Sequence, residues 1–337
     1  FVNQKKPLIS VLLPAYNAAT TVLAAARSIL EGTFKDLELV VVDDGSTDRT
    51  FETLKSISDP RLVLTRTPHQ GVVAAANKAA SMAQAQWIAR MDADDLSHPH
   101  RLEKQWEFAE QNRCDIVSGL VRIVDLKGHP VQSMRRYEDW LNSLRTHEDL
   151  LANRFIELPM VNPSILARRE FFLNKCRQGD FPEDYDQWLS ALQIGARAGK
   201  TESFILDWRD RPNRLTRRDT RYKREAFDRC KKHHLLKGPL RDIRKIILWG
   251  VGQTGKPWLT WLLKEDFEIP YAIDVSPKKM GQCIHGVKVI SPEQLRRIYE
   301  PELFVLAAVG AFGARETIAG YLKHLGCIPG RNLWFVA

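Results

Sequence analysis

The first hundred residues alternate short apolar runs with stretches of helical periodicity, and this alternation constrains the fold more than any other feature of the chain. Apolar runs of strand length cover residues 8–13 (LISVLL), 37–42 (LELVVV) and 87–91 (WIARM). Such runs are typical of strands covered on both faces. Residues 18–30 and 72–83, which lie between them, carry apolar side chains at the 3.6-residue spacing of a helix. The alternation predicts a mostly parallel α/β sheet flanked by helices.

The pattern becomes less regular after residue 125 and resumes after Gly238-Pro239. In the irregular part we expect helical stretches at 139–152 and 185–194. The resumed alternation predicts a second, smaller domain with a Rossmann-like α/β fold. The predicted domains are residues 1–237, with halves at 1–125 and 126–237, and residues 238–337.

Composition excludes several classes of protein. The longest apolar runs, at residues 246–249 and 304–309, are far shorter than the roughly 18 residues that cross a bilayer. The apolar run before Pro14 is too short for a signal-peptide core, so we expect a cytoplasmic location. The cysteines are odd in number and never form a CxxC pair, which predicts reduced and mostly buried thiols. They are Cys114, Cys176, Cys230, Cys283 and Cys327.

Positive charge is concentrated in one segment. The chain carries a formal net charge of +9, and residues 197–245 alone contain 17 Lys and Arg against seven Asp and Glu. A basic balance is compatible with nucleic acid, an anionic membrane surface or a phosphorylated substrate. Because the rest of the chain is nearly neutral, the partner is expected at this segment.

Two polar clusters follow the first two predicted strands. Pro14-Ala15-Tyr16-Asn17 could hold a flat base against backbone polar groups, or could form an ordinary turn. Asp43-Asp44-Gly45-Ser46 could accept hydrogen bonds from a nucleobase or a ribose, or could serve as a turn with a helix N-cap. In open α/β sheets, ligands bind at these carboxyl ends of strands.

A third cluster, Asp92-Ala93-Asp94-Asp95, follows the run that ends at Met91. Three carboxylates in four residues repel one another unless a cation is present, and Mg²⁺ or Mn²⁺ prefers oxygen ligands. We therefore expect a divalent metal on Asp92 and Asp94, the alternative being a solvated acidic turn.

Two further clusters lie in the second half of the first domain. Glu183-Asp184 opens a predicted helix with Tyr185 and Trp188 behind it, a setting that suits a general base, although Asp184 could also be a helix N-cap. Residues 208–216 (WRDRPNRLT) form a basic loop that could neutralise phosphate or face solvent.

Taken together, the clusters resemble the family 2 glycosyltransferases, which are inverting sugar transferases of the GT-A fold. The resemblance covers roughly residues 7–216. It is carried by LISVLLPAYNA, LELVVVDDGSTDRT, HQGVVAAANKAASMAQAQWIARMDADDLSHPHRLEKQ, RCDIVSG, VNPSILARREFF and FPEDYDQWL, in the family's order.

The resemblance implies a role for each matching residue. Asp184 becomes the catalytic base, and Asp92 and Asp94 hold the metal. The positions implied for nucleotide-sugar binding are Pro14, Ala15, Tyr16, Asn17, Asp43, Asp44, Gly71, Asn77, Asp92, Ala93, Arg211 and Arg214. Those implied for acceptor binding are Asn162, Glu183 and Trp188. The implied donor is a UDP-sugar, and the implied reaction is a single displacement onto an acceptor hydroxyl, with transfer of a hexosyl or N-acetylhexosaminyl group.

One position departs from the family. Many relatives carry a metal-binding His in the basic loop, where this chain has Arg211. This puts a third protein ligand for the metal in doubt. An arginine here could instead bind the diphosphate through paired hydrogen bonds.

In the second domain, Gly250, Gly252 and Gly255 follow the run at 246–249, and Asp274 comes about 20 residues later. This is the dinucleotide-binding pattern, in which a helix N-terminus receives phosphate and the acid binds ribose. The segment also looks like the nucleotide- or CoA-binding-like domains of bacterial polysaccharide-biosynthesis enzymes. NAD(P), a CoA-like ligand and a purely assembling or regulatory domain all stay open.

Two rival functions remain. An NAD-dependent oxidoreductase would use the glycine loop but leaves the acidic clusters unexplained, and the Tyr-x-x-x-Lys pair of short-chain reductases does not occur. A non-enzymatic nucleotide- or nucleic-acid-binding protein would use the basic segment but lacks interleaved aromatic residues. We favour the transferase in cell-surface polysaccharide or glycolipid biosynthesis, acting on a glycan or lipid-linked acceptor without nucleic acid. Residues 217–232 could contact anionic lipid at the inner face of the plasma membrane, and the C-terminal domain could mediate homo-oligomerisation.

Overall fold

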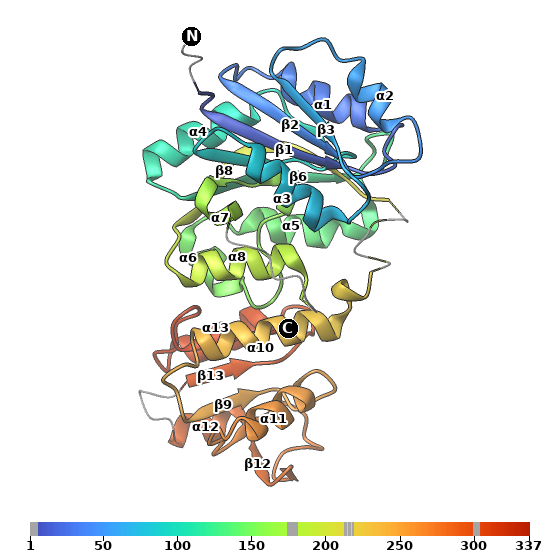
Figure 1. Ribbon diagram of the computed structural model, residues 1–337. Coiled ribbons are helices and arrows are strands. Elements are labelled where there is room, and N and C mark those ends of the chain that lie inside the picture. The colour runs from blue at the N-terminus through green and yellow to red at the C-terminus, as the bar shows by residue number, and fades with distance from the viewer. Residues whose placement is uncertain (1–5, 174–180, 212–213, 215–216, 218, 299–303) are drawn as a thin grey trace. The chain divides into compact units, whose positions relative to one another are not determined.

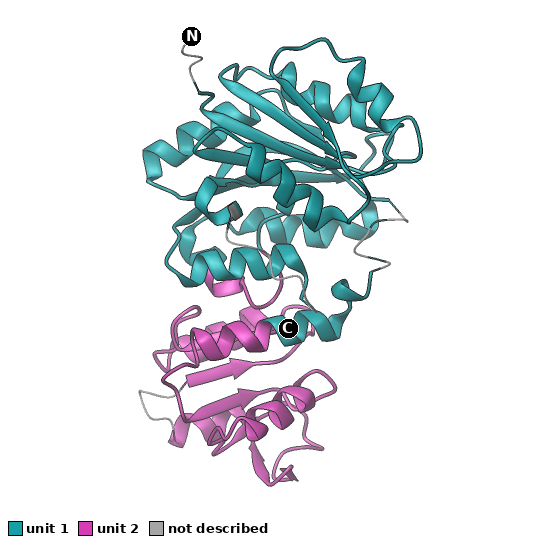
Figure 2. Ribbon diagram, viewed as in Figure 1, with its two compact units in different colours: residues 1–150, 159–230 teal, residues 151–158, 231–337 magenta. Residues whose placement is uncertain are grey.

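The protein is described from a computed structural model covering residues 6–173, 181–211, 214, 217, 219–298 and 304–337 (Figure 1). Cys176 and the loop residues Pro212, Asn213, Leu215, Thr216 and Arg218 lie outside the described residues. The chain forms two compact units, residues 1–150 with 159–230 and residues 151–158 with 231–337 (Figure 2). The domain boundary that we expect near residue 238 stays a prediction; the second compact unit resumes at Lys231.

The first unit is built on an eight-stranded sheet in the order β3-β2-β1-β4-β7-β6-β8-β5. Its strands are β1 (Ile9–Ala15), β2 (Leu37–Asp43), β3 (Leu62–Arg66), β4 (Trp87–Arg90), β5 (Leu96–Ser97), β6 (Ile116–Val124), β7 (Leu166–Arg168) and β8 (Ala198–Arg209). Strands β3, β2, β1 and β4 run parallel, and β7 is antiparallel to both β4 and β6. The predicted mixed α/β fold with a mostly parallel first half is confirmed.

The central strands are apolar because helices cover them. Every residue of β1 and β2 is buried. In α1 (Val22–Leu30), five residues are buried and belong to the same apolar core as the strands. The other helices of this unit are α2 (Thr50–Lys55), α3 (Val72–Met82), α4 (Arg101–Asn112), α5 (Arg135–Ser143), α6 (His147–Asn153), α7 (Arg169–Leu173), α8 (Glu183–Gln193) and α10 (Arg224–Lys237). Residues 151–153 of α6 and 231–237 of α10 are assigned to the second unit. Short 3₁₀ turns occupy Gln132–Met134, Asn162–Ser164 and Thr220–Tyr222.

The single helical stretch that we expected over residues 139–152 is wrong, because α5 and α6 are separate helices. The side chains at the start of α6 explain the break. Thr146 Oγ1 accepts a hydrogen bond from the N–H of Asp149 at 3.1 Å, and Asp149 Oδ2 accepts one from the N–H of Thr146 at 3.0 Å. This reciprocal capping box starts a new helix.

The second unit contains a six-stranded sheet in the order β11-β12-β10-β9-β13-β14. Its strands are β9 (Ile246–Trp249), β10 (Ala272–Ile273), β11 (Cys283–Ile284), β12 (Val287–Ile290), β13 (Phe304–Ala307) and β14 (Leu333–Phe335), and its helices are α11 (Gly255–Lys264), α12 (Pro292–Ile298) and α13 (Ala314–Lys323). All its pairings are parallel except β11 with β12. The second region of α/β alternation is therefore confirmed as a second sheet.

Two sequence expectations concern the chain as a whole. Within the described part of the chain, no helix is both long enough and apolar enough to span a bilayer. Cys114, Cys230 and Cys327 form no disulfide and are buried, as expected, whereas Cys283 forms no disulfide and is exposed.

Candidate active site

Three of the predicted clusters lie at one edge of the first sheet. Strands β2, β1 and β4 are neighbours and run parallel, so the residues that follow them emerge at the same edge (Figure 1). The N–H of Asp44 donates to Ala15 O at 2.8 Å, which joins the first two clusters directly. The sheet topology thus brings together segments that are up to about 80 residues apart in the chain.

The first cluster forms a rigid loop with one exposed aromatic ring. Asn17 has a positive φ of 47°, and its Oδ1 accepts a hydrogen bond from the N–H of Thr47 at 2.9 Å. Tyr16 is 45% exposed and stacks on His69 with ring centroids 4.0 Å apart. Pro14 and Ala15 belong to β1 itself. Sequence reasoning missed His69, although it lies in the matching stretch that begins HQG.

The paired aspartates of the second cluster have different surroundings. Both carboxylate oxygens of Asp44 bind the loop before α3: Oδ1 accepts from the N–H of Gln70 at 2.9 Å, and Oδ2 accepts from the N–H of Gly71 at 2.8 Å. Asp43 is fully buried, and Arg66 Nε lies 3.1 Å from its Oδ2 without hydrogen-bond geometry. Asp44 therefore orders the loop, whereas Asp43 retains a buried acceptor without a hydrogen-bond donor in the described structure.

Gly71 and Asn77 lie at the start of α3. Gly71 precedes the helix with a φ of 91°, a conformation that favours glycine. Asn77 is half-buried in the second turn. The Asp44 carboxylate, bound to the Gly71 N–H, fixes where this helix begins.

The third cluster gathers three carboxylates. One oxygen from each of Asp92, Asp94 and Asp95 can be chosen so that all lie within 4.8 Å of one another. Arg90 Nη2 lies 2.8 Å from Asp92 Oδ1, and the N–H of Arg209 donates to Asp95 Oδ1 at 2.8 Å. Asp95 is 1% exposed, and its Oδ2 has no hydrogen-bond partner among the described residues. Ala93, between them, is buried.

The electrostatics of this cluster favour a cation. Burial and the charge of Asp92 raise the pKa of Asp94, although Arg211 opposes the shift. Burial and the charges of Asp94 and Asp92 raise the pKa of Asp95 well above its usual value. Oxygen ligands at this spacing, with one buried oxygen unpartnered, fit a hard divalent ion. Asp95 joins the two expected ligands in this set.

Arg101 lies close to the acidic cluster and was not predicted from the sequence. It is fully buried at the start of α4, and its Nη2 donates to Arg90 O at 2.8 Å. Burial lowers its pKa to about 10, while the charges of Asp95 and Asp92 act in the opposite direction. It remains a cation at neutral pH, within reach of the charges of Asp95 and Asp92.

The candidate base lies at the start of α8. Asp184 is half-buried, and its Oδ1 accepts a hydrogen bond from the N–H of Tyr185 at 2.8 Å. Burial, and then the neighbouring charge of Glu183, raise its pKa to about 7, and the charge of Asp92 contributes to the same shift. The helix N-cap is Pro182, so the Asp184 carboxylate is not used as a cap.

Glu183 is held by residues that sequence reasoning did not identify. Tyr222 Oη donates a hydrogen bond to Glu183 Oε1, and Arg221 Nη1 lies 3.9 Å from Glu183 Oε2. Burial and the charges of Asp184 and Glu183 raise the pKa of Tyr222, so its hydroxyl stays protonated and can donate. The short turn at 220–222 brings these side chains to α8, although Tyr222 is 39 residues from Glu183 in the sequence.

Trp188, which we expected to bind the acceptor, is not available for that role. Its side chain is fully buried and packs edge-on against Phe172. Its Nε1 donates to Asn162 Oδ1 at 3.0 Å. Because it lies on the inner face of α8, Trp188 orients Asn162 rather than contacting a ligand.

The described part of the basic loop pairs its cations with acids. Arg211 Nη2 lies 2.5 Å from Asp94 Oδ2. Arg214 stacks over Trp208 at 4.0 Å and lies 3.6 Å from Asp210, which also binds Arg217 at 2.8 Å. Arg211 therefore pairs directly with the acidic cluster, whereas Arg214 and Arg217 share the carboxylate of Asp210, and the charge of Arg214 also acts on Asp94 and Asp95.

The glycine loop of the second unit is tightly constrained. Gly250 has a φ of 100°, and a Cβ at Gly255 would lie 1.8 Å from Gly250 O. Asp274 Oδ2 accepts from Lys279 Nζ at 2.9 Å and from the N–H of Val251 at 3.1 Å. Burial alone would raise the pKa of Asp274, but these hydrogen bonds hold it below its usual value. Lys279, which lies 3.6 Å from the place of a Cβ on Gly252, thus occupies the carboxylate that we expected to bind a ribose.

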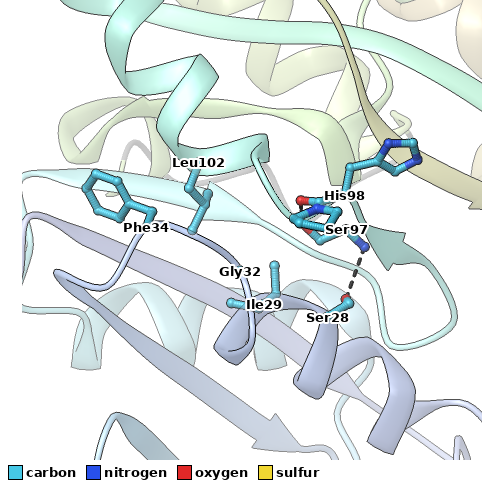
Figure 3. Close-up of a pocket in the computed structure, with 8 residues that line it drawn as sticks. Ser28, Ile29, Gly32, Phe34, Ser97, His98 and Leu102 are labelled. Carbon is cyan, nitrogen blue, oxygen red and sulfur yellow. Dashed lines mark hydrogen bonds between the residues drawn. The ribbon is translucent and has the colours of Figure 1, made fainter.

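A small pocket in the first unit contains none of the predicted site residues (Figure 3). Within it, the N–H of Ser97 donates to Ser28 Oγ at 3.0 Å. Its lining residues are Ser28, Ile29, Gly32, Phe34, Ser97, His98, Pro99 and Leu102. This hydrogen bond joins α1 to the segment that precedes α4.

Comparison with known proteins gives consistent results. Residues 10–176 match Glycosyl transferase family 2. An uncharacterised glycosyltransferase of Haemophilus influenzae is 30% identical over 209 residues, covering 59% of this chain and 64% of that protein. Chondroitin synthase of Pasteurella multocida is 36% identical over 99 residues, covering 29% of this chain and 10% of that protein. The matched regions thus span less than two thirds of either relative.

A solved structure extends the comparison to the fold. The crystal structure of S. aureus TarS 1-349 in complex with UDP-GlcNAc has a TM-score of 0.55 and 17% sequence identity, covering 69% of this chain and 67% of that chain. At this identity the similarity shows the fold alone, and the expected GT-A fold is confirmed.

Proposed function

Since residues 10–176 belong to glycosyl transferase family 2, we propose that this chain transfers a sugar from a nucleoside-diphosphate sugar to an acceptor hydroxyl, with inversion at the anomeric carbon. The observation that carries the proposal is electrostatic. The charge of Asp92, in the acidic cluster, helps to raise the pKa of Asp184 to about 7. This interaction supports the proposal that the candidate metal site and the candidate base form one site, as a displacement between a diphosphate and a hydroxyl requires.

We propose that the donor's base binds at the Tyr16 and Asp43 side of the site. Asp43 Oδ2, buried and without a donor in the described structure, suits an N–H of a nucleobase, and Tyr16 offers an exposed ring. Uracil has such an N–H, and the S. aureus protein of similar fold was crystallised with UDP-GlcNAc. A UDP-sugar that carries a hexosyl or N-acetylhexosaminyl group is therefore the proposed donor.

Asp92, Asp94 and Asp95 would hold Mn²⁺ or Mg²⁺, and the unpartnered Asp95 Oδ2 supports this assignment. The ion would supply positive charge against the developing charge of the diphosphate. The nearby arginines Arg211 and Arg214 would add hydrogen-bond donors to the same leaving group.

Asp184 would take the proton of the acceptor hydroxyl. As the acceptor oxygen forms a bond to the anomeric carbon, the bond from that carbon to the diphosphate breaks, and the nucleoside diphosphate leaves with the electron pair. At neutral pH a carboxyl group with a pKa near 7 exists in both forms, so Asp184 can accept and then release a proton.

We propose a glycan or lipid-linked acceptor in cell-surface polysaccharide or glycolipid synthesis, since a named relative is a chondroitin synthase. Cytoplasmic location, contact with anionic lipid at the inner face of the plasma membrane and an assembling or regulatory role for residues 238–337 complete the proposal.

A panel of nucleotide sugars, assayed for Mn²⁺- or Mg²⁺-dependent release of nucleoside diphosphate, tests the proposal. Asp184→Asn should lower turnover of the active donor by about 10²–10⁴-fold, because a general base contributes that much, while UDP binding measured by calorimetry stays unchanged. Asp139→Asn, at an exposed position paired with Arg135, is the matched control. Near-normal turnover by Asp184→Asn would reject the assigned base.

A further inference from the structure

Arg211 lies on the basic loop after β8, and its side chain pairs with the acidic cluster. Its Nη2 lies 2.5 Å from Asp94 Oδ2, with 33% of the Arg211 side chain and 16% of the Asp94 side chain exposed. At this distance the guanidinium and the carboxylate form a close ion pair. Arg211 therefore occupies an oxygen that a divalent cation would need.

The other oxygens of the cluster show what a cation would find. Asp92 pairs with Arg90, and Asp95 Oδ1 accepts from the N–H of Arg209. Both partners come from the strands that frame the cluster, β4 and β8, and they hold the carboxylates in place. Asp95 Oδ2 has no hydrogen-bond partner within the described ranges. Arg211, on the loop after β8, is the partner that lies outside the strands of the sheet.

Arg211 also carries a donor that suits an anion. Its Nε is buried and makes no hydrogen bond in the described structure. Arg214 and Arg217, by contrast, lie against Asp210 in their own loop. Among these three loop cations, Arg211 has its counter-ion in the cluster itself.

We propose that Arg211 is an exchangeable counter-ion: it neutralises Asp94 before the substrate complex forms, leaves Asp94 when a divalent cation binds the cluster, and then binds the diphosphate of the donor. This inference rests on the proposed metal site. It makes Arg211 oppose metal binding in the free protein and favour nucleotide binding once the metal is present. The two steps couple metal and nucleotide affinity through one side chain.

Calorimetric titration with Mn²⁺ alone tests the first step. Arg211→Ala should bind Mn²⁺ about tenfold more tightly than the wild-type protein, within the usual range of coupling between sites. Arg211→Lys, which keeps the charge, should bind Mn²⁺ as weakly as the wild type. Arg145→Ala removes a cation paired with Glu202 elsewhere on the first unit and should leave Mn²⁺ affinity unchanged. Unchanged, weaker or undetectable Mn²⁺ binding by Arg211→Ala would overturn the inference.

The second step is measured with UDP at saturating Mn²⁺. Arg211→Ala should then bind UDP about tenfold more weakly than the wild type, because it lacks the released guanidinium. In an Asp94→Asn background, Arg211→Ala should no longer tighten Mn²⁺ binding, since the pair is already broken. A persisting effect in that background would contradict the assigned partner.

These binding readouts separate the inference from the proposed function. If wild-type protein releases UDP from a donor but Arg211→Ala does not gain Mn²⁺ affinity, the counter-ion role fails alone. If no nucleotide sugar is turned over while Arg211→Ala binds Mn²⁺ more tightly, the exchange stands and the transferase proposal fails. Circular dichroism melting of each variant verifies that the fold is intact.

Discussion

At the scale of single residues, the site depends on where each carboxylate is buried. Asp43, Asp44, Asp94 and Asp95 lie at or just after the ends of buried strands, but their oxygens differ in hydrogen bonding. Both oxygens of Asp44 accept hydrogen bonds from the backbone at residues 70–71. Asp43 and Asp95, by contrast, each have one buried oxygen without a hydrogen bond in the described structure. Burial of a polar atom without a partner costs free energy, so such atoms mark the places where a ligand would be stabilising.

Asp184 gives a prediction about pH. Burial and the charge of Glu183 raise its pKa to about 7, and only its deprotonated form can accept a proton. Turnover measured at saturating donor and metal should therefore rise tenfold per pH unit below about pH 7 and level off above it. A pH profile between 5 and 9, with buffers of constant ionic strength, measures this.

Glu183→Gln provides the comparison for that profile. Removing the like charge beside Asp184 should lower the pKa of Asp184, so the rising limb should move to lower pH. An unmoved limb would contradict the assignment of the limb to Asp184.

At the scale of elements, the contact between the 220–222 turn and α8 connects the end of the basic loop to the base. Tyr222→Phe removes the hydroxyl that donates to Glu183 Oε1. Glu183 would lose its strongest described donor, and Asp184 its fixed neighbour. We expect kcat to fall about tenfold, equivalent to about 1.4 kcal/mol, while KM for the donor changes little.

The matched variant for this test is Tyr321→Phe. Tyr321 Oη donates to Pro292 O at 2.5 Å in the second unit, so its loss removes a comparable hydrogen bond away from the candidate site. Steady-state kinetics of both variants distinguish the two effects. An equal loss of kcat in both would show a general effect of losing a tyrosine hydroxyl.

The elements also show what the sequence could predict. Strands β1 and β2 were predictable because both of their faces are buried, which leaves an apolar run. Asp92 and Asp94 could be singled out as candidate metal ligands because they follow such an apolar run. The break between α5 and α6 was not, because it depends on two side-chain hydrogen bonds at Thr146 and Asp149.

Residues that are brought together only by the tertiary fold could not be identified from sequence patterns. Arg101, His69 and Tyr222 gave no periodic signal, and each becomes part of the site through a partner at least ten positions away. Trp188 was misassigned because its position beside the acids in sequence does not reveal which face of α8 it occupies. The helix places its ring in the core.

At the scale of the whole molecule, the basic segment is less available than its composition suggests. Arg217, Arg221 and Arg224 lie next to Asp210, Asp219 and Asp228. Lys231 is buried and donates to two backbone carbonyls. Paired and buried cations attract an anionic surface less than free ones do, because their charge is partly compensated. The proposed lipid contact therefore depends on the remaining exposed cations, such as Lys223.

The two compact units have separate apolar cores. Ile9, Val11 and Leu39 belong to the core of the first unit, and Ile247 and Leu333 belong to that of the second. Because each core is made from residues of its own unit, we predict two thermal unfolding transitions in scanning calorimetry. Leu259→Ala, at a fully buried position of α11, should lower only the transition of the second unit, since such a substitution costs about 2–5 kcal/mol.

Once each thermal transition is assigned to a unit, the transition that a ligand raises identifies the unit to which the ligand binds. UDP with Mn²⁺ at about 100 times its dissociation constant should stabilise the first unit by about 2.7 kcal/mol and raise its transition alone. NADH should leave the second transition unchanged, because Lys279 already occupies the Asp274 carboxylate that a ribose would need. A rise of the second transition with NADH would instead support a dinucleotide site there, and with it the oxidoreductase reading of the glycine loop.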